Sequence, residues 1–151
     1  MLIDQRRFHG LTHSADLIEA ELRRRLAPLD LQPRQAQIIE AMARMGPVSQ
    51  ADLAGEFEIT AASMSTMTDR LLAAGYISRS RDPASRRQNV LELTEKALAK
   101  LPGIELAWTG VDAAIKGVLG DDADTFFRLA RRLRDGLGGT PPGVRVKRAK
   151  I

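Results

Sequence analysis

Four arginines lie close together in the stretch RSRDPASRRQNVLELTEK, which runs from Arg79 to Lys96. Asp82 and Pro83 supply turn chemistry between two short runs of alternating character, so the arginines surround a predicted hairpin turn. Guanidinium groups bind phosphate oxygens and enter the narrow, electronegative minor groove of A·T-rich DNA. The alternative is that these arginines only keep an exposed turn in contact with water.

A second group of residues that could carry out chemistry is His9, His13 and Asp16, which are separated by four and three residues. This spacing places three possible metal ligands on one face of a helix. Gly10 weakens the helix at this point, and no Glu follows the first His as a metalloprotease requires. We assign no metal and no other cofactor, and keep a small helical metal-dependent hydrolase built on these residues as an alternative.

The composition predicts one helical domain. The chain has 151 residues, of which 44% are hydrophobic and 28% charged, enough apolar mass to bury a core. It has no cysteine, which excludes disulfides and thiol redox switches and suits a cytoplasmic protein. No apolar run approaches the roughly 20 residues of a membrane helix, and the N-terminus lacks the apolar core of a signal peptide. We therefore expect no membrane partner.

The positive charge is concentrated at the C-terminus. The net charge is +4, and residues 140–151 contribute Arg145, Lys147, Arg148 and Lys150 with no acid, which matches the whole excess. The net positive charge of the chain is therefore not evidence for nucleic-acid binding. Only the positions of the basic residues could be such evidence. We expect residues 139–151 to form a flexible tail, with non-specific phosphate contact as the functional alternative.

Apolar periodicity predicts a long first helix that ends before Pro28 and a second helix from Pro33 to Gly46. Ser49, with Asp52 three residues on, begins a short third helix that ends near Phe57. The apolar positions of the first helix are Leu11, Ala15, Ile18, Leu22 and Leu26.

A fourth helix is predicted between Thr60, as its N-cap, and Gly75, as its left-handed C-terminal residue. Together the third and fourth helices form a helix-turn-helix, and the hairpin of residues 76–81 and 89–93 that follows makes it a winged helix. The inward positions of the fourth helix are Met64, Met67, Leu71 and Leu72. Its outward positions are Ala61, Ala62, Ser63, Ser65, Thr66, Asp69 and Arg70. Small residues and hydroxyls allow close approach to a major groove.

Beyond the hairpin, Thr94 caps another helix, which Pro102 and Gly103 must kink or break. Asp121 is predicted to cap the last helix, whose apolar face includes Phe126 and Leu137. Trp108 is either a core residue or part of the wall of a ligand pocket.

The segment SQADLAGEFEITAASMSTMTDRLLAAGYISRSRDPASRRQNVLELTEK resembles the winged-helix core of MarR-type transcriptional regulators. The resemblance includes a DLA helix, a Ser/Thr-rich recognition helix ending in DRL and Gly, a DP-containing wing with paired arginines, and a closing LTEK. It covers about Leu31 to Lys96, and the flanking helices fit the family by length and order.

This resemblance implies a mainly α fold, with about six helices and a small β-hairpin wing in a winged helix-turn-helix with a helical dimerisation region. It implies one domain over residues 1–138, in which 1–30 and 101–138 dimerise and 31–100 bind DNA. It further implies a homodimeric, non-enzymatic regulator, acting as a repressor on a pseudo-palindromic operator. A small aromatic or phenolic effector would release the DNA.

Residue by residue, Ser63, Ser65, Thr66 and Arg70 match the family's groove-facing positions, and Arg87 matches its minor-groove arginine, with Arg86 beside it at the hairpin tip. The resemblance and the helix order suggest His9, His13 and Trp108 for the effector.

The sequence departs from the family pattern at three positions. Ser85 stands where the family usually has a bracing Asp, and Ala97 where Gly commonly follows LTEK. Glu58 replaces a frequent Gly in the helix-turn-helix turn, which predicts a turn without positive φ. A constitutive winged-helix module for DNA or protein contacts, without an effector, remains the main alternative.

Overall fold

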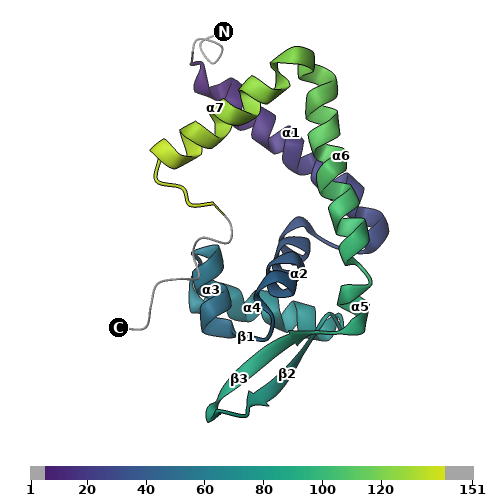
Figure 1. Ribbon diagram of the computed structural model, residues 1–151, viewed down its shortest axis with the longest axis vertical. Coiled ribbons are helices and arrows are strands. Elements are labelled where there is room, and N and C mark those ends of the chain that lie inside the picture. The colour runs from purple at the N-terminus through teal and green to yellow at the C-terminus, as the bar shows by residue number, and fades with distance from the viewer. Residues whose placement is uncertain (1–5, 142–151) are drawn as a thin grey trace.

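Two groups of helices lie at opposite ends of the computed structural model (Figure 1), which describes residues 6–141 apart from the side chains of 86–88. One end is made of three helices: α1 (Phe8–Leu26), α6 (Leu101–Leu119) and α7 (Ala123–Gly136). The other holds α2 (Pro33–Met45), α3 (Gln50–Phe57), α4 (Ala61–Ala73), α5 (Glu95–Leu98) and a three-stranded sheet. The mainly α winged helix-turn-helix predicted from the sequence is confirmed.

Local signals set the helix boundaries that the sequence predicted. Helix α1 ends at Leu26, and Pro28 lies inside the short 3-10 helix η2 (Ala27–Leu29) that follows. Helix α2 begins at Pro33 after a capping box between Gln32 and Gln35, and it ends before Gly46, whose φ is 75°. These boundaries match the predicted ones because caps and prolines act through neighbouring residues.

The sheet contains one strand that the sequence did not reveal. Strand β1 (Val48–Ser49) pairs antiparallel with β3 (Ser85–Leu93), which also pairs with β2 (Ile77–Asp82), so that the order is β1-β3-β2. Two residues are too few to show the alternating pattern of a strand, and their partner lies far along the chain.

The hairpin is longer than predicted. The predicted strands were 76–81 and 89–93, but only Pro83 and Ala84 separate β2 from β3. The Asp82 carboxylate accepts a hydrogen bond from the Ala84 amide at 2.9 Å, which closes the turn within these residues. A register shift between Arg81 and Asp82 accommodates the additional residues of β3.

Two helix starts differ from their predicted positions. The break near Pro102 falls before that residue, since α6 already begins at Leu101 and Pro102 lies in its first turn, where no amide hydrogen bond is lost. Asp121 does not cap the last helix. It lies inside the 3-10 helix η3 (Gly120–Asp122), and α7 follows with Asp122 at its N-cap and no side-chain cap bond.

Buried apolar side chains of α1, α2, α3, α4, β3 and α6 form one core. Ile38, Ile39 and Leu71 are fully buried, and the buried Tyr76 hydroxyl donates to the Asp30 carbonyl at 3.3 Å. Burial, together with the nearby charge of Asp30, raises the pKa of Tyr76. The first helix is thereby joined through the turn at Asp30 to the end of the molecule that holds α4 and the sheet.

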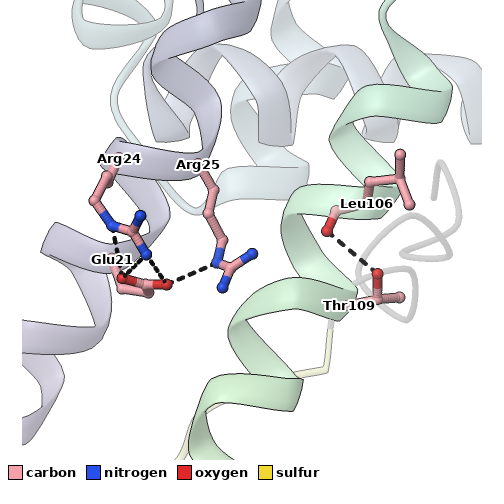
Figure 2. Close-up of polar contacts among 5 residues, drawn as sticks. All are labelled: Glu21, Arg24, Arg25, Leu106 and Thr109. Atoms are coloured by element: carbon pink, nitrogen blue, oxygen red, sulfur yellow. Dashed lines mark hydrogen bonds and ion pairs between the residues drawn. The ribbon is translucent and has the colours of Figure 1, made fainter.

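Helices α1 and α6 lie side by side, and Glu21, Arg24 and Arg25 form a polar cluster on α1 beside α6 (Figure 2). Glu21 accepts hydrogen bonds from Arg24 at 2.6 Å and from Arg25 at 2.7 Å, and the bond from Arg24 holds the pKa of Glu21 below its ordinary value. The Arg25 guanidinium lies over Gly110 of α6, where a Cβ atom would clash with it. A glycine at this position allows the arginine to cross between the two helices.

Large apolar side chains remain exposed at the α1, α6 and α7 end. Their exposed fractions reach 52% for Leu11, 85% for Val118 and 50% for Leu133. Further examples are Phe8, Leu17, Leu129 and Leu137. Within residues 6–141, no helix combines the length and apolarity that crossing a membrane requires.

Candidate nucleic-acid interface

Helix α4 is held at its N-terminus by Thr60. The Thr60 Oγ1 accepts a hydrogen bond from the Ser63 amide at 3.1 Å and lies 3.0 Å from the Ser63 hydroxyl, to which it donates. The preceding turn contains Glu58 at φ 52°, so the predicted absence of positive φ in this turn is wrong. Non-glycine residues reach the small left-handed region at a modest cost, so Glu58 can occupy this turn position.

The two faces of α4 separate as predicted. Met64 and Leu71 are fully buried, whereas Ser63, Thr66 and Arg70 are exposed. The Thr66 hydroxyl donates to the Ala62 carbonyl at 3.3 Å, and Arg70 forms no ion pair with any other described residue. Ser65 differs from this set because it is half-buried and borders a surface notch of about 430 Å³ between α4 and the hairpin.

A polar network that sequence reasoning missed fixes α4 against α3 and β2. The buried Thr68 hydroxyl lies 3.0 Å from Gln50 Oε1, which also accepts from Arg79 at 3.5 Å. Arg79 Nη2 lies 4.0 Å from Asp69 Oδ1. This network links the first residue of α3, helix α4 and the first hairpin strand, and so holds the hairpin against α4. A polar residue on the inward face, Thr68, was the available sequence signal.

The base of the hairpin is fastened to the end of α4. The Thr94 hydroxyl donates to the Gly75 carbonyl and the Lys96 ammonium to the Ala74 carbonyl, each at 2.6 Å. Lys96 also lies 4.8 Å from the centre of the Tyr76 ring. Thr94 and Lys96 of the LTEK segment therefore hold the base of the hairpin against the end of α4.

The hairpin projects from this base beyond the helices (Figure 1). Arg79 and Arg81 are exposed on β2. The backbone of Arg86 and Arg87 lies in β3 rather than in a loop, and their side chains fall outside the described part of the structure. The backbone arrangement therefore presents a positively charged strand pair next to α4.

A cavity of about 390 Å³ lies at the junction between α1 and α6 on one side and α2 and α3 on the other. Trp108 is half-buried in its wall, as are Leu22 and Phe57. Arg44 Nη2 lies 2.6 Å from the buried Glu56 Oε1, and the Arg34 guanidinium lies 5.4 Å from the centre of the Phe57 ring. The cavity thus combines aromatic walls with two arginines and two glutamates, Glu40 and Glu56.

His9 and His13 lie elsewhere, in a surface depression near the start of α1 that Asp16 also borders. The His9 ring stacks on Phe8 with 4.3 Å between ring centres. Within one chain, the two histidines therefore do not share a cavity with Trp108. Among the described residues, no three His, Cys, Asp or Glu side chains are arranged to hold a metal ion.

A capped, exposed helix after a tight turn, followed by an arginine-bearing hairpin, defines the winged-helix class of DNA-binding proteins. The sequence model of the MarR family matches residues 29–88. This part of the chain matches the MarR family of DNA-binding transcriptional regulators, as the sequence resemblance predicted. MarR family regulators are not enzymes, so the match gives the hydrolase alternative no support.

Solved structures share the fold across nearly the whole chain. A mutant of MarR from E. coli in complex with operator DNA matches with a TM-score of 0.72 and 19% identity, over 83% of this chain and 92% of that one. The transcriptional repressor CouR, bound to a 23-mer DNA duplex, matches with a TM-score of 0.76 and 22% identity, over 87% of this chain and 94% of that one.

A third structure concerns BpsR of Bordetella bronchiseptica, whose DNA binding is regulated by 6-hydroxynicotinic acid. Its TM-score is 0.75 at 20% identity, over 90% of this chain and 96% of that one. No curated protein sequence matches the chain.

Proposed function

We propose that the chain is a cytoplasmic, ligand-responsive repressor that binds a pseudo-palindromic operator as a homodimer. The exposed face of α4, held at a fixed angle to an arginine-bearing hairpin, is the observation that carries this proposal. A rigid angle matters because helix and wing must enter neighbouring grooves at the same time. Repression follows if the bound dimer excludes other proteins from the operator.

In this proposal the exposed Ser63 and Thr66, with Ser65 at the edge of the notch, contact bases in the major groove. Arg70, exposed in the last turn of α4, contacts a phosphate. Arg86 and Arg87 enter the adjacent minor groove from the wing.

The homodimer is supported by the apolar surface at the α1, α6 and α7 end. Leu17 is 59% exposed and Leu137 is 79% exposed, more apolar area than an isolated end of a domain normally shows to water. We assign residues 1–30 and 101–138 to dimerisation and 31–100 to DNA binding. A two-fold dimer would present its recognition helices about 10 base pairs apart.

The junction cavity is the proposed effector site. Trp108 and Phe57 offer aromatic walls to a planar ring, and Arg34 or Arg44 suits a carboxylate or phenolate group. Because the cavity lies between the proposed dimerisation helices and the DNA-binding helices, a bound molecule would bias the spacing of the two α4 helices. His9 and His13 would join this site only through a partner subunit.

Replacing Arg87 tests the DNA-binding surface. Arg87→Ala should weaken operator binding by about 1 to 3 kcal/mol and reduce the preference for A·T pairs at the outer edges of the site, since one minor-groove guanidinium is lost. The operator is obtained by enrichment from a random duplex library and affinity is measured by fluorescence anisotropy. Lys116→Ala, which removes one exposed charge at the far end of α6, is the matched control. Equal affinities of the Arg87 variant and the parent chain would contradict the role of the wing.

Titration with candidate effectors tests the cavity. Salicylate, hydroxylated aromatic acids or phenols should change the fluorescence of Trp108, the only tryptophan, and lower operator affinity by about 5- to 150-fold. Arg34→Gln should reduce the ligand response while leaving binding of the operator intact, because Arg34 lies outside the proposed DNA face. If aromatic acids, phenols and divalent metals change neither signal, the protein is instead a constitutive DNA-binding dimer.

A further inference from the structure

The surface notch between α4 and the hairpin is lined by side chains that can donate hydrogen bonds. Its volume is about 430 Å³, and it lies where the start of α3, helix α4 and strands β2 and β3 meet. Hydroxyls and amides can donate or accept, whereas an arginine only donates. The polar side chains around the notch are Ser49, Gln50, Ser65, Arg79 and Asn89, and the buried Leu91 also borders it.

The notch differs in charge from the other hollows of the molecule described above. The junction cavity contains Glu40 and Glu56, and the depression beside His9 contains Asp16. No acidic side chain lines the notch within the described part of the chain. Of these three hollows, the notch is therefore the one whose lining favours an anionic group.

The register of the sheet brings these donors together. Arg79 of β2 pairs with Leu91 of β3. Asn89 lies two residues before Leu91 along β3, so its side chain projects from the same face of the sheet. On the other side of β3, strand β1 ends at Ser49, and α3 begins with Gln50. Residues that are far apart in the sequence thereby border one hollow.

The contacts of Gln50 determine which end of its side-chain amide is available. Its Oε1 lies 3.0 Å from the Thr68 hydroxyl and accepts a hydrogen bond from Arg79 at 3.5 Å. The two N–H groups of the same amide form no hydrogen bond with any other described residue. Because the acceptor is already engaged, Gln50 offers donors to an incoming group.

Further donors around the notch are also unused among the described residues. Arg79 Nη2 makes only long contacts, at 3.5 Å to Gln50 and 4.0 Å to Asp69, and its other N–H groups contact no described acceptor. The Ser49 hydroxyl accepts from a backbone amide of α3 at 3.0 Å, and its own proton stays available. The exposed Asn89 side chain forms no hydrogen bond with the described residues. An anion with several oxygens could accept from these groups together.

The position of the notch matches the path that the DNA backbone would take. In the proposed function, α4 lies in a major groove and the hairpin enters the adjacent minor groove. Neighbouring grooves of a duplex are separated by one sugar-phosphate strand, so this strand must pass between α4 and the hairpin. The notch lies between the same two elements.

We propose that the notch is a phosphate site, in which Gln50, Arg79 and Asn89 donate to the DNA phosphodiester that separates the two grooves, with the Ser49 hydroxyl beside them. This inference rests on the proposed function. Phosphates are the same at every base pair, so the site fixes the position of α4 on the duplex and adds affinity without base preference. Thr68 acts as a positioning residue, because it contacts the engaged oxygen of Gln50.

Neutralising one phosphate at a time tests the site. Duplexes enriched from a random library are prepared with a single uncharged methylphosphonate linkage, which is moved across each half-site and its flank, and affinity is measured by fluorescence anisotropy. In the parent chain, the linkage between the two grooves should weaken binding about tenfold, as a charge-assisted contact is lost.

Asn89→Asp and Gln50→Glu each place a carboxylate at the notch. Both should weaken binding to the unmodified duplex about tenfold or more, and equally on the enriched duplex and a scrambled version of it. The neutral linkage between the grooves should then raise their affinity, opposite to its effect on the parent, because it removes the repulsion between carboxylate and phosphate. The slope of log affinity against log salt should fall by about 0.9 per protomer.

The variants are chosen to leave the fold intact, which circular dichroism verifies. Asn89→Asp breaks no hydrogen bond of the side chain with a described residue, and Gln50→Glu keeps an oxygen for Thr68 and Arg79. Lys116→Gln, in the last turn of α6, lowers the net charge by the same amount and is the matched control. It should respond to the neutral linkage as the parent does.

A parent chain that binds equally well with a neutral linkage at every position between the grooves would overturn the inference. Variants that lose the same affinity on neutral and unmodified duplexes would also overturn it, since the loss would then not arise at that phosphate. If inorganic phosphate alone, and no DNA linkage, distinguished the parent from the variants, the notch would bind a free anion instead. A chain that enriches no preferred duplex would refute the proposed regulator, while salt slopes on the scrambled duplex would still decide whether the notch binds phosphate.

Discussion

Arg44→Met is expected to lower the free energy of unfolding by about 2 to 3 kcal/mol. Arg44 Nη2 lies 2.6 Å from Glu56 Oε1, and the Glu56 side chain is only 3% exposed. Removing the arginine withdraws positive charge that offsets the burial of this carboxylate. Removing one partner of a buried pair costs more than replacing both partners by apolar residues. The Arg44 side chain is itself 44% exposed, so the expected loss lies below that of a fully buried pair.

Urea denaturation of the parent chain and the variant measures this loss. Arg34→Met on the same helix is the matched control, because Arg34 lines the same cavity but contacts the Phe57 ring instead of a buried acid. In a Glu56→Gln background, Arg44→Met should cost clearly less, since no buried charge remains to be offset. Equal costs in both backgrounds would show that the ion pair does not stabilise the junction of α2 and α3.

Features that depend on neighbouring residues were predictable from the sequence. Ser49, Thr60 and Thr94 cap their helices as their positions indicated, with the Ser49 hydroxyl accepting from the Asp52 amide at 3.0 Å. Gly75, at φ 76°, follows the end of α4 as expected. These signals placed the helix-turn-helix and its wing because the cap, the turn and the hydrophobic stripe all act within a few residues.

Features that depend on distant contacts were not predictable. Strand β1 exists because Val48 and Ser49 find partners in β3, more than forty residues later. The positive φ of Glu58 is a local exception: it belongs to the left-handed C-terminal cap of α3, and a residue other than glycine gave no signal for it. Asp121 has the residue type of an N-cap, but it lies inside the 3-10 helix Gly120–Asp122, and α7 begins only at Ala123.

The candidate site likewise has features that could be predicted from the sequence and features that could not. The outward face of α4 could be read from its spacing, whereas the Thr68–Gln50–Arg79 network joins three elements and leaves only one polar residue as a sequence signal. Trp108 was compatible with a core or a pocket position, and packing places it half-buried in the wall of the junction cavity. A single side chain cannot indicate a cavity that the packing of four helices creates.

Loss of the dimer should have the largest effect on function. The double variant Leu129→Asp and Leu133→Asp places two charges on the apolar face of α7, where the side chains are 46% and 50% exposed in the single chain. Because these residues are not buried within one chain, the substitutions should disturb association far more than folding. A monomer contacts only one half-site, so operator affinity should fall about 100-fold or more as the linkage of two sites is lost.

Sedimentation equilibrium at micromolar concentration checks the first step, and anisotropy with full-length and half-site duplexes checks the second. The parent chain should sediment as a dimer and prefer the full-length duplex, whereas the double variant should sediment as a folded monomer that binds both duplexes equally weakly. Arg131→Asp, which introduces aspartate on the opposite face of α7, should leave the dimer and its affinity almost unchanged. A folded parent monomer at this concentration would contradict the homodimer, because the exposed leucines would then be stable in water without a partner.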